Sequence, residues 1–119
     1  MSTATPDYAE ALIGWRVWCV VETRDGPRLA SVIKDELWPH GGELIARCHE
    51  RGRHDAPEEN CTCGIHAARD PATVWTYLRG RNDPPTVGRV LGRVALWGRV
   101  VEHEHGWRAS HALPLDIYP

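Results

Sequence analysis

The segment from Cys48 to His66 constrains this chain more than any other. It holds three of the four cysteines and three of the seven histidines of the sequence, yet its one large apolar side chain is Ile65. Burial in a hydrophobic core cannot order a segment of this composition. Thiolate and imidazole groups that bind a metal ion can order it, because metal binding contributes directly to the free energy of folding. The sequence therefore predicts a metal-ordered loop in the middle of the chain.

Four residues of this segment form the predicted ligand set. Cys61 and Cys63 are closer in sequence than the Cys-x-x-Cys pair of most zinc knuckles, and Cys48 lies upstream of them. If the chain turns helical at Gly64, Cys63 and His66 share one face of a turn and can bind one ion. The preferred ligands are Cys48, Cys61, Cys63 and His66, with His54 as the alternative fourth ligand and His49 after it. Four protein ligands leave no position for a substrate, which favours a structural zinc ion.

Other interpretations of the cluster stay open. The residues can be reduced thiols without a ligand, an iron–sulfur centre, or a redox dithiol made by Cys61 and Cys63. Cys19 stands apart in an apolar strand pattern, and we interpret it as a core residue.

Length and composition limit the class of protein. The 119 residues suffice for one domain with a modest core. A formal net charge of -2 provides no overall attraction to nucleic acid or to an anionic membrane. We find no signal-peptide pattern and no window near the roughly 18 apolar residues of a membrane span, so we expect a cytoplasmic protein. Thirteen arginines against one lysine, with abundant Ala, Gly and Pro, suggest a GC-rich bacterial genome.

Alternating apolar side chains predict a mainly antiparallel β domain. The expected strands cover residues 14–23, 28–33, 43–48, 87–103 and 107–113, and residues 1–7 are expected to be frayed. Asp70 and Pro71 mark the start of a helix over residues 72–79, and Gly80 marks its end. Residues 64–69 are expected to form a turn that leads into this helix.

Two glycines predict strong curvature of the sheet. Gly92 and Gly98 fall on the apolar face of the strand at residues 87–103, where a missing side chain lets a strand curl. We expect a small curved antiparallel sheet or an SH3-like barrel of about five or six strands, with one inserted helix and a Cys/His metal loop. The fold class is mainly β (α+β), in a single domain over residues 1–119.

The six tryptophans suggest a binding surface, because a domain this small cannot bury all of them. We predict a ligand or partner surface, for a protein or a small molecule, at Trp97, Trp107, Trp38, Arg93 and Arg99. Arginines at positions 89, 93 and 99 beside Trp97 also fit a nucleic-acid-binding face, which the net negative charge disfavours. His103, His105 and His111 lie near the last hairpin and are more typical of solvated residues than of ligands.

The sequence favours a non-enzymatic role. Ser31 and Ser110 lack motif context, and the chain contains no glycine-rich phosphate loop or nucleophile elbow. The leading hypothesis is a zinc-stabilised small binding domain. A metal or thiol redox protein is the first alternative, and a nucleic-acid-binding module is the second.

Two short blocks carry a resemblance to a family. The run Cys61-Thr62-Cys63-Gly64-Ile65-His66-Ala67, preceded by Ala56-Pro57, and the run Leu96-Trp97-Gly98-Arg99-Val100-Val101-Glu102-His103 resemble small uncharacterised bacterial proteins with a Cys-x-Cys-Gly-Ile-x-Ala motif. In those proteins the position of His66 is often tyrosine, which favours His54 as the fourth ligand. The resemblance implies no activity.

Overall fold

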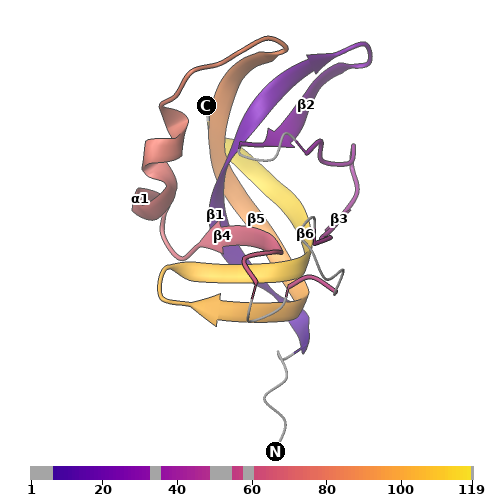
Figure 1. Cartoon of the computed structure of the whole chain (residues 1–119), viewed down its shortest axis with the longest axis vertical. Coiled ribbons are helices and arrows are strands. Elements are labelled where there is room, and N and C mark those ends of the chain that lie inside the picture. Colours follow the sequence, from indigo (N-terminus) through magenta and orange to yellow (C-terminus); the bar gives the residue numbers. More distant parts are fainter. Residues whose placement is uncertain (1–6, 33–35, 49–54, 58–60, 119) are drawn as a thin grey trace, which may run out of the picture.

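The computed structural model describes residues 7–32, 36–48, 55–57 and 61–118. In chain order the elements are β1 (Asp7–Thr23), β2 (Gly26–Ser31), β3 (Leu44–Ile45), β4 (Ile65–Ala68), α1 (Pro71–Val74), the 3-10 turn η1 (Trp75–Leu78), β5 (Thr86–His103) and β6 (Gly106–Tyr118). All paired strands are antiparallel. The predicted mainly β domain with one inserted helix is confirmed, and the helix is short (Figure 1).

The strand pairings form a closed circuit. β1 pairs with β5, β5 with β6, β6 with β4, and β4 again with β1. The contact between β1 and β4 is the single pair of Trp15 and Ala68. β2 pairs with the same edge of β1, from Trp18 to Thr23. On this edge of β1, Arg16 and Val17 therefore pair with no strand among the described residues, because they lie between the residue paired with β4 and the residues paired with β2.

β3 and β4 lie end to end along one edge of β6. The N–H of Ala46, just after β3, donates to the carbonyl of Ser110 over 2.8 Å. The neighbouring residue of β6, Ala109, pairs with Ile65 at the start of β4. The chain thus leaves this edge and returns to it at adjacent positions. The two ends of the intervening central loop, residues 47–64, lie side by side.

The core lies inside the curved sheet. Trp18 and Trp38 meet edge to face, with ring centroids 5.4 Å apart. The Nε1–H of Trp38 donates to the hydroxyl of Ser31 over 3.0 Å. Trp38 is only 2% exposed, so it belongs to the core and not to the predicted ligand surface. The other buried members are Leu44, Ile65, Ala67, Val94, Leu96, Val100, Ala109 and Ala112.

The predicted helix is shorter than expected. Asp70 caps it as predicted and accepts a hydrogen bond from the N–H of Thr73 over 3.1 Å. One α-helical turn is then followed by the 3-10 turn η1, and neither contains a buried residue. Since little burial offsets the cost of helix nucleation, the segment stays short. No helix in the described ranges is long and apolar enough to cross a membrane.

Arg89 of β5 holds the end of this helical segment. Its guanidinium donates to the carbonyl oxygens of Tyr77, Arg79 and Arg81 and to the side-chain oxygen of Asn82, over 2.8 to 3.3 Å. Gly80 has φ of +153°, a backbone conformation that residues other than glycine rarely adopt.

β4 is the largest departure from the sequence prediction. Residues 64–69 were expected to form a turn, but Ile65–Ala68 is a strand between β6 and β1. A four-residue strand is too short for alternation to reveal it. Its conformation is set by the paired neighbours, so tertiary context overrides the local pattern.

Two glycines of β5 permit close backbone approach, each for a different reason. A Cβ at Gly92 would overlap the carbonyl oxygen of Asp116 and lie 2.9 Å from the ring of Trp18. Gly98 adopts φ of +81° within the irregular stretch of the β5–β6 pairing. Gly92 therefore allows tight curvature on the inner face, and Gly98 forms a bulge.

The substitution Gly92→Ala tests this packing. We expect it to lower the free energy of unfolding by about 1–3 kcal/mol, as overpacking of a close contact does. Gly88→Ala in the same strand is the matched control, because no atom lies within 4 Å of its added Cβ. Urea denaturation measures both variants, and equal losses would contradict the close approach at Gly92.

Candidate metal centre and the adjoining cleft

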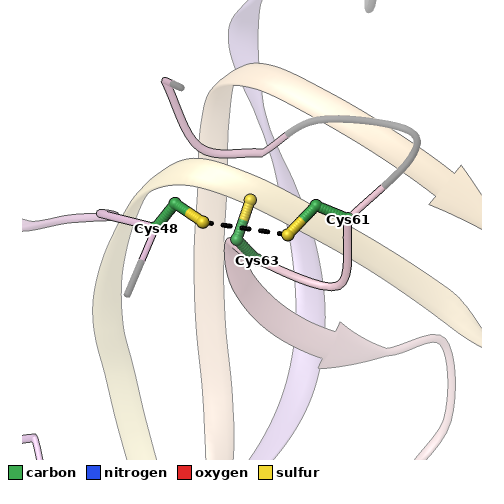
Figure 2. A group of neighbouring side chains, drawn as sticks. All are labelled: Cys48, Cys61 and Cys63. Atoms are coloured by element: carbon green, nitrogen blue, oxygen red, sulfur yellow. Dashed lines mark hydrogen bonds between the residues drawn. The ribbon is translucent and has the colours of Figure 1, made fainter. Parts of the chain in front are cut away.

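Three cysteines meet where the central loop joins the sheet (Figure 2). Cys48 lies on the stem that leaves β3, whereas Cys61 and Cys63 lie on the stem that returns to β4. Their sulfur atoms all lie within 4.8 Å of one another, and Cys48 Sγ is 3.8 Å from Cys61 Sγ. The structure thus brings together the three predicted cysteine ligands.

The sulfur separation fits a shared metal ion. A disulfide requires an S–S distance of about 2.05 Å, and Cys48, Cys61 and Cys63 form no disulfide. Two thiolates bound to one tetrahedral zinc at about 2.3 Å each lie about 3.8 Å apart. The observed separation of Cys48 and Cys61 matches that value without rearrangement.

The wall behind the cluster is tightly packed. Cys63 is 1% exposed, while Cys48 and Cys61 are half-buried. Gly64 has φ of +112°, and a Cβ there would lie 2.8 Å from the buried ring of Pro57. Arg108 donates to the carbonyl of Cys63 over 2.8 Å. The close approach of Pro57 and the hydrogen bond from Arg108 hold the backbone at Cys63 and Gly64 in place.

His66 does not join the three cysteines. His66 lies in the strand β4, so Cys63 and His66 do not share the helical turn that the sequence predicts. Its Nε2 is 2.9 Å from the carbonyl oxygen of Thr62. Among the residues that the structure describes, no His, Asp or Glu completes the group. His54 and His49 lie outside the described residues, and His54 stays a prediction.

The residues of the predicted tryptophan surface lie in different surroundings. Trp107 is partly buried and packs against the core. The ring of Trp97 stacks on His111 at a centroid distance of 5.8 Å. Arg93 forms an ion pair with Asp116 over 2.5 Å. The backbone N–H of Arg99 donates to Ser110 over 2.9 Å, and Trp38 is buried.

A cleft of about 510 Å³ opens beside the metal centre, at the gap between β1 and β4. Its lining includes Trp15, Arg16, His66, Val74, Tyr77 and His103. Thr62, which stands between Cys61 and Cys63, also lines it. None of these residues except His66 was predicted as part of a site. The sequence does contain a signal for Arg16, because this charged residue shares one face of its strand with Leu12, Gly14 and Trp18.

Arg16 fills the gap between the strands. Its guanidinium donates to the carbonyl of His66 over 2.7 Å and to the hydroxyl of Ser31 over 3.1 Å, so it connects β4 to β2. It also lies 5.0 Å from the ring centroid of Trp38. Burial lowers the pKa of Arg16 to about 10, against the opposing effect of Glu36, and the group remains charged at neutral pH. Its Nε is buried without a hydrogen-bond partner.

Two histidines of the cleft have lowered pKa values. His66 is an exposed residue by surface area, but desolvation of its ring at the cleft lowers its pKa, and Arg16 and Arg108 act in the same direction. Desolvation also lowers the pKa of His103, with help from Arg108 and Arg69. The two rings lie 6.2 Å apart. Both imidazoles are therefore neutral at neutral pH.

Comparisons with protein-family models, with curated proteins and with solved structures give no match for this chain. Its function is therefore inferred from the geometry of the metal centre and the cleft.

The lowered pKa of His66 predicts a pH dependence of stability. Below pH about 6.5 the unfolded histidine takes up a proton that the folded one resists, so stability falls as pH falls through this window. We expect His66→Gln, whose amide can still donate to Thr62, to weaken this dependence. Urea denaturation between about pH 5 and about pH 8, the range in which histidines titrate, measures it. The exposed His40→Gln is the control, and an unchanged slope in His66→Gln would contradict the assignment.

Proposed function

We propose that the protein is a small non-enzymatic binding domain whose central loop is clamped by a zinc ion on Cys48, Cys61 and Cys63. The convergence of three sulfurs at the two loop stems carries this proposal. Ordering a loop of this length costs conformational entropy, and its sequence offers almost no large apolar side chain whose burial could offset that cost. A metal bound across the stems offsets that cost, because its binding energy is available only to the folded chain.

Zinc suits this donor set better than an iron–sulfur centre. Such centres are usually held by four cysteine thiolates. The fourth cysteine of this chain, Cys19, is buried within β1 and is not part of the group. Three thiolates and one further ligand form a common structural zinc site.

Exposure disfavours the alternative of a redox dithiol at Cys61 and Cys63. A thiolate must be reachable to exchange with a partner disulfide. Cys63 is only 1% exposed, so the pair presents one accessible sulfur, that of Cys61. This arrangement suits a structural role more than thiol exchange.

The nucleic-acid alternative loses two of its three arginines to internal contacts. Arg89 binds backbone carbonyls at the end of η1, and Arg93 pairs with Asp116. Charge that is already paired contributes little to phosphate binding. Binding in the cleft is better supported than binding on this face.

The scaffold of the proposed domain is a small barrel-like sheet. The pairing circuit of β1, β5, β6 and β4 supports this shape, as does the close approach at Gly92. The site of ligand binding is the cleft at Trp15 in place of the predicted surface at Trp97 and Trp107. This position is next to the metal centre, since Thr62 lines the cleft.

Elemental analysis of the untagged protein tests the zinc proposal. We expect about one zinc per chain, and loss of β structure in circular dichroism when a chelator removes it. Cys61→Ser should lose the metal and lower the free energy of unfolding by several kcal/mol, on the scale of losing a structural metal. Iron, or a melting curve of Cys61→Ser equal to that of the parent, would refute the proposal.

Two variants separate the ligands from their neighbours. Cys19→Ala is the matched control, because it removes a buried thiol outside the group and should retain zinc. His66→Gln should also retain zinc and leave the absorption of the cobalt-substituted protein unchanged. A spectral change in His66→Gln would instead make His66 a ligand.

A further inference from the structure

We propose that the cleft between β1, β4 and the helical segment binds a small organic anion with an aromatic body. The body lies against Trp15 and Tyr77, and the carboxylate or phosphate lies beside His66 and His103. This inference deepens the proposed binding function and rests on it.

The size and walls of the cleft fit a small molecule. Its volume of about 510 Å³ lies within the range of small-molecule sites. Trp15 from β1 and Val74 and Tyr77 from the helical segment provide apolar and aromatic surface. Tyr77 keeps 43% of its surface exposed, although most tyrosines in a small domain are better covered. A flat apolar group can therefore be enclosed between β1 and the helical segment.

The charges at the far end of the cleft favour an anion. Arg16 and Arg108 act on the ring of His66, and Arg108 and Arg69 act on the ring of His103. Each of these positive charges lowers the pKa of the imidazole beside it. The arginines therefore make the electrostatic potential at the two rings positive, although the net charge of the whole chain is negative.

The acidic groups near the cleft already face arginines. Glu36 lines the cleft itself and raises the pKa of Arg16, and Glu102 pairs with Arg69 over 2.5 Å. Neither carboxylate is among the groups that shift the pKa of His66 or His103, so neither offsets the effect of the arginines on these two rings.

The same field argues against a second metal ion at the two histidines. Two imidazoles with centroids 6.2 Å apart could approach a shared cation after a small movement. A divalent cation there would be repelled by Arg16 and Arg108, whereas an anion is attracted by both. Geometry allows either ion, and electrostatics selects the anion.

Fluorescence titration of the zinc-loaded full-length chain tests the inference. The probe is 8-anilinonaphthalene-1-sulfonate, and its uncharged analogue N-phenyl-1-naphthylamine is the matched control. We expect saturable one-to-one binding of the sulfonate, at least about tenfold tighter than that of the neutral analogue. Phenyl phosphate and benzoate as competitors show which anionic group is preferred, and benzyl alcohol should not compete.

Substitutions at Tyr77 locate the site without disturbing the core. Tyr77→Glu adds a negative charge to the cleft wall and should weaken sulfonate binding by about tenfold through repulsion. Tyr77→Gln introduces a side chain of nearly the same shape as Tyr77→Glu but without its charge, and this variant should retain the preference for the anion. Arg16→Gln should weaken binding too, and circular dichroism shows whether this variant stays folded.

Equal affinity for the charged and neutral probes would overturn the inference, as would equal binding by Tyr77→Glu and Tyr77→Gln. The zinc content of each preparation separates this result from the proposed function. One zinc per chain without anion preference refutes the anion site alone, whereas a folded chain without metal refutes the zinc clamp.

Discussion

The shared edge of β6 is the constraint on which the rest of this structure depends. β3 and β4 both pair with that edge, at adjacent positions, so the ends of the central loop must lie together. This arrangement brings Cys48 against Cys61 and Cys63 although about a dozen residues separate them. The thiol cluster is therefore a consequence of strand pairing, and a metal bound there reinforces the pairing that created it.

Arg16 has a second organising role, because it spans the gap that the short pairing of β1 and β4 leaves open. A buried guanidinium is tolerated there since backbone and hydroxyl oxygens accept its hydrogen bonds. The carbonyl of His66 binds Arg16, and the ring of His66 binds the carbonyl of Thr62, between two of the cysteines. Hydrogen bonds thus connect Arg16 in the cleft to Thr62, which stands between Cys61 and Cys63.

Local chemistry made several features readable before the fold was known. The Asp70 cap, the long final hairpin and the crowded position of Gly92 follow from residue type and periodicity alone. Features that depend on distant partners were missed. β4 has too few residues to show a period, and without it the placement of His66 on a helical turn seemed natural. Trp38 was assigned to a surface because nothing in its loop reveals that it packs on Trp18.

The sequence by itself determined that the domain is mainly β with a helix capped by Asp70, and that its central segment holds three of the four cysteines. These are local properties, set by side-chain alternation, capping and composition. Only the tertiary structure decided that His66 lines a cleft, that Arg89 and Arg93 are engaged internally, and that Trp38 is buried against Trp18. The physical reason is that facing and partnership depend on strand register and curvature, which arise from contacts between residues far apart in the chain.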